Sequence, residues 1–316
     1  MVSILHSIKE ALKGIDCLYF PIARARYLQI AAGTLLLGDR YFIEREYFKR
    51  LGRKLDLANP KTFNEKIQWL KLNFRKDIQT TLADKYAVRG WLAGHFGREY
   101  LIPLLFSTSD PDEIRPENIP DVPCIIKSTH DCGKWFICRD KGAVDWKRLR
   151  RLCRLWLFRN YYYVSHEWHY KNIPPRIIVE KLLLNREGKI PNDYKLEFFN
   201  GRLGFVYCSI DREGGNYRNM YDPDWKPMYF SWGSHPERGP EIEPPASFGK
   251  MLSIGSQIAR MFKHVRVDFY DVDGKLYYGE VTFHHGNGFN RFSPDSYDYY
   301  FGDMLDLNAP VLEDLQ

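Results

Sequence analysis

The sequence predicts an α+β protein, and three observations lead to this class. Residues 1–95 carry charges at helical intervals with few alternating apolar positions, which indicates helices. Short apolar segments flank Asn200-Gly201, and another pair flanks the turn at residues 271–274, so two antiparallel hairpins are expected. No regular alternation of strands and helices appears, and neither a dinucleotide-binding nor a Walker glycine pattern is present.

Composition excludes several classes. The 316 residues suffice for one large or two modest domains, and 44% apolar with 27% charged residues argues against a disordered, collagen-like or coiled-coil chain. A net charge of +6 is low for a nucleic-acid-binding protein, so no nucleic-acid partner is expected. An anionic small substrate, a polyanionic polymer or a membrane surface remains compatible. The six cysteines form no C-x-x-C pair, which favours a reducing cytoplasm.

The N-terminal third is expected to be helical. The first ten residues are interrupted by charges and do not form a secretory signal. Tyr27–Gly38 is apolar but shorter than the roughly 20 residues that a transmembrane helix needs, so we expect a buried helix, with a helix lying on a membrane as the alternative. Thr62 and Glu65 have the spacing of a capping box and predict a helix start. Residues 82–95 predict another helix.

The remaining elements follow from apolar runs and turn residues. Strands are expected at residues 124–127, 177–180, 195–199, 203–210, 265–270 and 276–283, and helices at 144–163 and 248–262. The basic residues of the first of these helices, Lys147 to Arg159, predict a solvated face, with contact to an anionic lipid headgroup or polysaccharide as the alternative.

The C-terminal hairpin carries a group of charged residues. Arg266 and Asp268 point to the same face of one strand, and the hairpin folds the second strand back so that Glu280 can approach Asp268. An arginine with two carboxylates suits a magnesium-bound triphosphate, because carboxylate oxygens hold the hard cation and the guanidinium neutralises phosphate. A surface hairpin with scattered charges is the alternative.

Two earlier segments carry weaker signals. Lys127 ends an apolar strand and precedes a small, polar loop through Lys134, a plausible phosphate cradle whose Gly133 could equally mark only a hairpin turn. Val179-Glu180-Lys181-Leu182-Leu183 is a strand running into a connection, where backbone groups could meet an adenine edge.

Together and in this order, the three segments resemble the ATP-grasp superfamily of ATP-dependent carboxylate ligases. The hairpin is similar to its R-x-D and Glu-x-Asn pattern, except that Thr282 stands where Asn is usual. Further segments resemble the TupA-like branch, which is linked to teichuronopeptide and other cell-surface polysaccharides: Asn59–Lys71, Ala83–Arg89, Ile126-Lys127 with its loop, Val179-Glu180, Asp193–Lys195 and Gly279–Phe283. The resemblance covers residues 55 to 307.

The resemblance implies a fold of two α+β subdomains that grip ATP between antiparallel sheets. It places a helical region at residues 1–95, a small subdomain with the phosphate loop at 96–180 and a C-terminal subdomain with the metal-binding hairpin at 181–316. Both ATP and Mg²⁺ are implied as cofactors.

It also implies residue roles. Arg266, Lys127 and Arg212 are the expected catalytic residues, and Asp268 and Glu280 hold Mg²⁺ with Thr282, Asn287 or water as the third ligand. The nucleotide is expected to contact Lys127, Ser128, Gly133, Lys134, the hinge Glu180, Lys181, Leu182 and Leu183, and Lys195. Arg218, His284 and Asn287 are candidates for the acceptor site. Lys85 and Arg89 lie in the resembling segments without an assigned role.

The implied reaction forms an amide. A carboxylate attacks the γ-phosphorus of ATP and gives an acyl phosphate with release of ADP, and an amine then displaces phosphate. The resemblance suggests a uronic acid of a surface glycan and an amino acid or other amine as substrates, in the cytoplasm or at the inner face of the membrane.

Three other functions stay open. The same site could phosphorylate a sugar hydroxyl, or the chain could be a non-catalytic glycan- or membrane-binding module. A glycosyltransferase would use a D-x-D motif, and Asp222-Pro-Asp224 and Asp271-Val-Asp273 have that form. His166-Glu-Trp-His169 lacks the spacing of H-E-x-x-H, so this motif predicts no zinc site.

Overall fold

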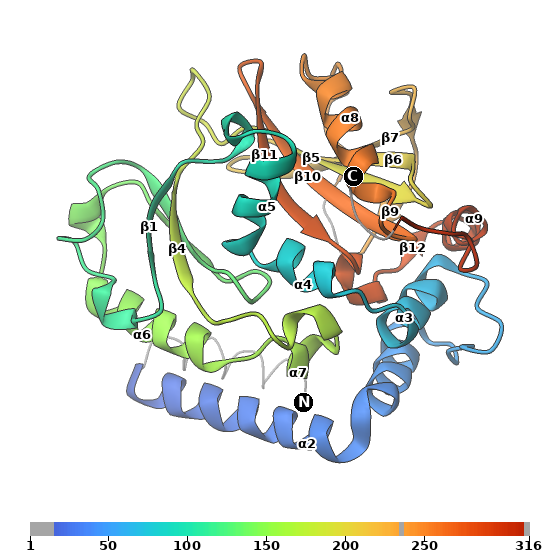
Figure 1. Ribbon diagram of the computed structural model, residues 1–316, viewed down its shortest axis with the longest axis horizontal. Coiled ribbons are helices and arrows are strands. Elements are labelled where there is room, and N and C mark those ends of the chain that lie inside the picture. The colour runs from blue at the N-terminus through green and yellow to red at the C-terminus, as the bar shows by residue number, and fades with distance from the viewer. Residues whose placement is uncertain (1–15, 234–236, 313–316) are drawn as a thin grey trace.

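The computed structural model describes residues 16–233 and 237–312. Four helices come first: α2 (Asp16–Leu51), α3 (Phe63–Asn73), α4 (Asp77–Ala83) and α5 (Ala87–His95). Two antiparallel sheets follow, and Figure 1 shows α4 and α5 lying between them. The predicted α+β class, with helices in the described part of the first third, is confirmed.

The smaller sheet has the order β1-β4-β2-β3. Its strands are β1 (Leu104–Thr108), β2 (Cys124–Ser128), β3 (Trp135–Cys138) and β4 (Ile177–Lys181). One face packs against α6 (Trp146–Phe158), where Trp156 meets Ile126 and Val179 in a buried cluster. The predicted helix at 144–163 is interrupted after Phe158, and α7 (Tyr162–Ser165) follows as a separate turn.

The larger sheet has the order β11-β10-β5-β6-β7-β8. Its strands are β5 (Asp193–Phe199), β6 (Arg202–Ile210), β7 (Tyr217–Tyr221), β8 (Pro227–Met228), β10 (His264–Val272) and β11 (Lys275–Thr282). Helix α8 (Phe248–Ala259) buries Ile254 and Ile258 against it. Gly255 permits the close approach, because a Cβ there would lie 2.7 Å from the Phe198 ring.

Several short elements complete the fold. They are β9 (Ser231–Trp232) paired with β12 (Phe292–Ser293), α9 (Ser296–Met304), and the 3₁₀ turns η1 (Arg98–Tyr100), η2 (Pro111–Glu113), η3 (Lys141–Ala143), η4 (Trp168–Tyr170) and η5 (His285–Gly288). Two residues separate the end of β11 from turn η5, which packs on α3, so the C-terminal hairpin is connected to the N-terminal helices.

Local signals set the helix boundaries in the first third. The capping box of α3 is confirmed: Glu65 N donates to Thr62 Oγ1 at 3.3 Å, and Thr62 N donates to Glu65 Oε2 at 3.0 Å. The single helix expected over residues 82–95 is wrong. It is divided at Asp84, whose carboxylate accepts a hydrogen bond from Tyr86 N at 2.9 Å and offers the backbone an alternative to continuing the helix.

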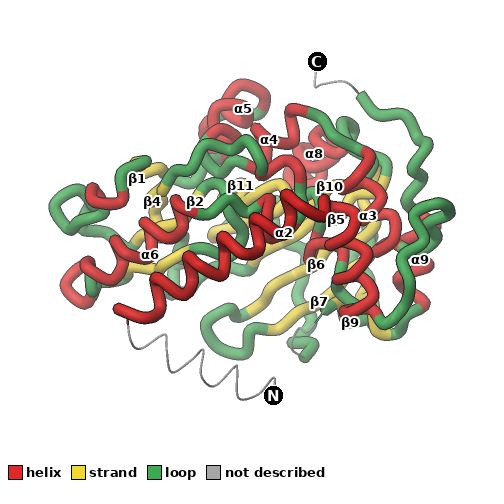
Figure 2. The backbone as a smooth tube through the Cα atoms, turned by 90° about the horizontal axis from the view of Figure 1, so that it is seen from below, coloured by secondary structure: helices red, strands yellow, loops and turns green. Residues whose placement is uncertain are grey.

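Helix α2 runs along the outside of the molecule beside α6 and α7 (Figures 1 and 2). It bends at Gly38, which has φ of 75°. Tyr27 and Thr34 face the body of the protein, but the side chains of Leu35 and Leu36 are 72% and 83% exposed. The expected buried helix at 27–38 is therefore wrong, because one apolar face is open to solvent. No helix within the described residues is long and apolar enough to cross a membrane.

Candidate functional site

The carboxylates of the C-terminal hairpin are brought together by a β-bulge. Val267 pairs with Val281 and Phe269 pairs with Tyr278, so Gly279 and Glu280 both lie opposite Asp268. A bulge of two residues against one re-aims the side chains of the longer strand. Gly279 is required by the close approach, since a Cβ there would lie 3.0 Å from the carbonyl oxygen of Asp268.

Arg266 links both carboxylates. Its Nε and Nη2 donate to Asp268 Oδ1 and Oδ2 at 2.6 and 2.8 Å, and Nη2 also donates to Glu280 Oε1 at 3.0 Å. Thr282 Oγ1 donates to the same Glu280 oxygen at 3.1 Å. Arg266 and Asp268 are buried, whereas the Glu280 side chain is 36% exposed. The carboxylates of Asp268 and Glu280 thus already bind one positively charged group, the guanidinium of Arg266. Their oxygen atoms are hard donors, which fit Mg²⁺.

The two carboxyl groups differ in their electrostatics. Burial raises the pKa of Asp268, while the charges of Arg266 and Lys195 oppose the rise. Burial also acts on Glu280, but the charges of Lys85 and Arg266 outweigh it and lower the pKa to about 2. At neutral pH the ionised form is therefore favoured more strongly for Glu280 than for Asp268.

A chain of charges extends from Asp268 across β5. Lys195 lies opposite Asp268 in the sheet, and its Nζ lies 3.6 Å from Asp268 Oδ2 while contacting Asp193. Arg212 Nη1 lies 3.5 Å from the same Asp193 oxygen, Oδ2. Lys195 therefore meets the hairpin directly, and Arg212 is linked to Lys195 through Asp193, a buried acid that was not among the predicted site residues.

Lys127 and Glu180 form a second centre on the smaller sheet. Lys127 Nζ lies 2.6 Å from Glu180 Oε2, and Arg89 Nη1 lies 2.7 Å from Glu180 Oε1. The carboxylate is buried, so both cations neutralise it in a site of low dielectric. Arg89, which had no assigned role, thereby acquires a partner. Lys181, Leu182 and Leu183 follow Glu180 at the end of β4.

The predicted phosphate loop is the connection between β2 and β3. Ser128 N donates to Lys134 O at 3.2 Å, and Gly133 adopts φ of 71°, so the loop closes as a hairpin. Lys85 joins this loop to the hairpin of the larger sheet. Its Nζ donates to Asp131 O at 2.9 Å and lies 4.0 Å from Glu280 Oε2.

The three residues expected at the acceptor site bind different partners through their side chains. Arg218, on β7, donates from Nε to Tyr207 OH at 3.0 Å and from Nη1 to the carbonyl oxygens of Asn216 and Tyr217. His284 Nδ1 lies 3.2 Å from Glu167 Oε2, and the Asn287 side chain contacts the buried Lys71 ammonium. Asn287 is thus held by α3, whereas Thr282 reaches Glu280 directly.

Sequence reasoning missed the support of Arg266. Glu197 lies opposite Arg266 on β5, and its carboxylate lies 2.7 Å from His285 Nδ1 and 3.1 Å from His264 Nε2. His285 Nδ1 in turn lies 2.9 Å from Arg266 Nη1. Against the effect of burial, the two histidines hold the pKa of Glu197 well below its ordinary value. The alternation of β5, which places Lys195 and Glu197 on one face, was the available signal.

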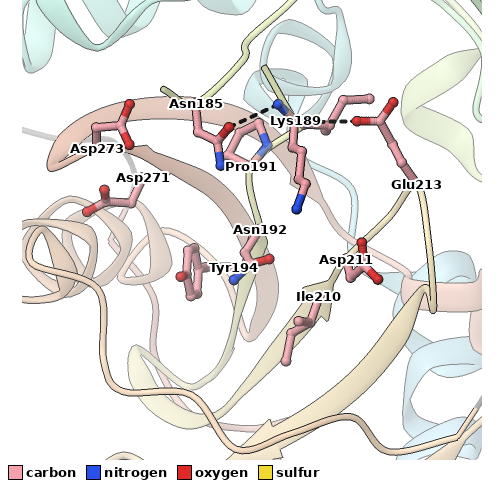
Figure 3. A pocket seen from close by; sticks show the side chains of 11 residues that line it. Asn185, Lys189, Pro191, Asn192, Tyr194, Ile210, Asp211, Glu213, Asp271 and Asp273 are labelled. Carbon is pink, nitrogen blue, oxygen red and sulfur yellow. Dashed lines mark hydrogen bonds between the residues drawn. The ribbon is translucent and has the colours of Figure 1, made fainter. Parts of the chain in front are cut away.

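A pocket of about 310 Å³ lies near the turn between β10 and β11. Its polar walls include Lys189, Asp211 and Asp271 (Figure 3). The backbone N–H of Ile190 donates to Glu213 Oε2 at its rim, at 2.9 Å. None of the predicted ATP-binding residues lines it, so the pocket is separate from the charged centres described above.

Comparisons with solved structures find partial likeness at low identity. The ATP-grasp ligase PsnB with minimal precursor, Mg and ADP has 14% identity and a TM-score of 0.36, over 65% of this chain and 52% of that one. D-alanine–D-alanine ligase from Bacillus anthracis with ATP has 15% identity and a TM-score of 0.35, over 64% of this chain and 53% of that one. A RiPP-associated ATP-grasp ligase from Chryseobacterium gregarium, with ADP and a leader and core peptide, has 13% identity and a TM-score of 0.38. The match covers 79% of this chain and 68% of that one. The chain spans about half the length of the first two.

No curated protein matches the chain. The sequence model of the TupA-like ATPgrasp family does match, over residues 65–306, which include both sheets and every predicted site residue. The resemblance stated from the sequence motifs is thereby confirmed. The chain belongs to the TupA-like ATPgrasp family.

Proposed function

We propose that the protein is an ATP-dependent carboxylate–amine ligase that requires Mg²⁺. The carrying observation is the group formed by Arg266, Asp268 and Glu280, linked through Lys85 to the phosphate loop. Membership of an ATP-grasp family and the oxygen-rich donor set both support it. In this proposal the two sheets are the halves between which ATP binds, and the three domain ranges given above apply.

In this proposal the carboxylates bind the metal and the cationic residues bind the phosphates. Asp268 and Glu280 would hold the metal, which would supply positive charge to neutralise the triphosphate. Lys127 and the loop from Ser128 to Lys134 bind phosphate oxygens, and Arg266 steadies the transferred group. Lys127 is paired with Glu180 and Arg266 with Asp268. When phosphate binds, each of these two cations therefore exchanges a carboxylate partner for a phosphate oxygen.

The substrates are proposed from the family alone: a uronic acid of a surface glycan or its precursor, and an amino acid or other amine. The test incubates the protein with ATP, Mg²⁺, glucuronic acid and a set of amino acids. A ligase releases inorganic phosphate and forms an amide that mass spectrometry detects. A kinase transfers phosphate to the sugar, and a glycosyltransferase leaves ATP intact; either result would refute the ligase.

We further propose that α2 lies on the inner face of a membrane. The exposed leucines before the Gly38 bend lie on the same helix as Arg24 and Arg26. A pocket of about 520 Å³ between α2 and α6 combines apolar walls with Arg24, Arg151 and Arg154, a combination that suits an anionic headgroup.

Vesicle sedimentation tests this surface. The protein should pellet with phosphatidylglycerol vesicles and less with phosphatidylcholine, and Leu35→Gln with Leu36→Gln should reduce binding. Tyr299→Gln, which removes an exposed aromatic ring from α9, is the matched control. Equal binding by the leucine double variant and the wild type would contradict the assignment.

A further inference from the structure

Three buried side chains from distant parts of the chain converge near the end of β11. Glu167 precedes η4, His169 lies within it, and His284 follows β11. One donor atom from each of the three lies within 4.8 Å of the others, and all three residues are no more than 5% exposed. His284 was expected at the acceptor site, but the phosphate and metal contacts proposed above use no member of this cluster.

The distances fit metal ligands better than a hydrogen-bonded network. His284 Nδ1 lies 3.2 Å and His169 Nε2 3.7 Å from the same oxygen, Glu167 Oε2. The second separation is too long for a hydrogen bond. Donor atoms around a tetrahedral zinc ion with bonds near 2.0–2.1 Å lie about 3.3 Å apart, so both separations are close to what the ion needs.

We propose that Glu167, His169 and His284 form a binding site for Zn²⁺ or a similar borderline divalent cation. Two imidazoles and one carboxylate are a donor set that selects such ions over Mg²⁺, and three protein ligands leave one coordination position for water or a substrate atom. The site is distinct from the hairpin carboxylates Asp268 and Glu280. It does not depend on the proposed ligase activity.

Lys71 is the charge that opposes the metal. Its buried ammonium contacts Asn287 and acts on Glu167, whose negative charge it balances in the metal-free protein. Replacing Lys71 by a neutral side chain of similar length removes the repulsion between its ammonium group and a bound divalent cation. Lys71→Met is therefore expected to bind the metal more tightly than the wild type.

The test measures metal binding without nucleotide. Metal-free full-length protein is mixed with Co²⁺, freed of unbound ion and examined by visible absorption and elemental analysis. We expect about one cobalt per chain with the intense bands of a four-coordinate nitrogen and oxygen site, displaced by Zn²⁺. His169→Asn and Glu167→Gln should each lose the bound ion and its bands.

Two controls separate this site from others. His166 is a buried neighbour whose Nδ1 faces Asp39 instead, so His166→Asn should retain the ion. Asp268→Asn should also retain it, because it alters only the hairpin. A folded wild type that binds no Co²⁺, or ion retained by His169→Asn and Glu167→Gln, would overturn the proposal. If both ligand variants fail to fold, weaker binding by Lys71→Met than by the wild type would also overturn it.

Discussion

Arg266 binds Asp268, two residues along the same strand, through two hydrogen bonds of 2.6 and 2.8 Å. Residues i and i+2 of a strand share a face, and the guanidinium fork matches a carboxylate, so the pair holds both charges in a buried place. The same guanidinium reaches Glu280 across the hairpin. Arg266 therefore fixes the positions of both carboxylates expected to hold Mg²⁺.

Arg266→Ala should strongly destabilise the protein. It leaves the Asp268 carboxylate buried without its main partner, and breaking a buried ion pair costs about 3–5 kcal/mol. The free energy of unfolding from urea denaturation measures the loss. Arg115→Ala, at an exposed position, should change it by less than about 0.5 kcal/mol. Equal stability of the two variants would show that the pair contributes little.

Gly279→Ala should disturb the bulge. The new methyl group would lie 3.0 Å from the carbonyl oxygen of Asp268, and overpacking of this kind costs about 1–3 kcal/mol. Gly249→Ala is the matched control on α8, because its methyl group would meet nothing within 4 Å. Urea denaturation should show a loss for the first variant and no loss for the second. The opposite order would contradict the role of Gly279.

Acidification should weaken the fold through His130. Burial lowers the pKa of this histidine, so below its ordinary value of about 6.5 the unfolded chain binds more protons than the native state. The stability is therefore complete above that pH and falls as the pH decreases, by at most about 1.4 kcal/mol per pH unit for one proton.

His130→Gln removes this titration and keeps a side-chain donor for Trp156 O. Unfolding free energies of metal-free protein between neutral pH and pH 5 should fall less steeply for the variant than for the wild type. Gln257→Ala, at an exposed position of α8, removes no titrating group and should follow the wild-type slope. Parallel curves for wild type and His130→Gln would contradict the prediction.

Local patterns in the sequence were sufficient for β2, β4, β5, β6, β10 and β11 and for the α3 start, but not for the shorter strands such as β1, β3 and β7. Asn200-Gly201 and Asp273-Gly274 supply the positive φ values of the two hairpins, and Thr62 with Glu65 forms both capping bonds. Alternation and a hairpin predict that Glu280 comes near Asp268, but they do not suffice to bring the two carboxylates to one face. A regular hairpin would pair Asp268 with Gly279, and only the bulge changes the register so that Glu280 also lies opposite Asp268.

Features set by distant contacts were not predictable. Helix propensity continues through Asp84, and only the side-chain bond to Tyr86 N reveals the break. Glu167 meets His284 across 117 positions, and no spacing rule connects them. The apolar residues of Tyr27–Gly38 indicated burial, yet Leu36 faces solvent because α2 lies at the edge of the molecule.

The melting temperature with Mg²⁺ and a non-hydrolysable ATP analogue tests the central proposal most directly. A ligand that binds only the folded state must raise stability by mass action. We expect a rise for the wild type and for Lys226→Ala, an exposed control, and its loss in Lys127→Ala and Glu280→Gln. No rise for folded wild type at millimolar nucleotide, or equal rises in all four proteins, would contradict an ATP site between the two sheets.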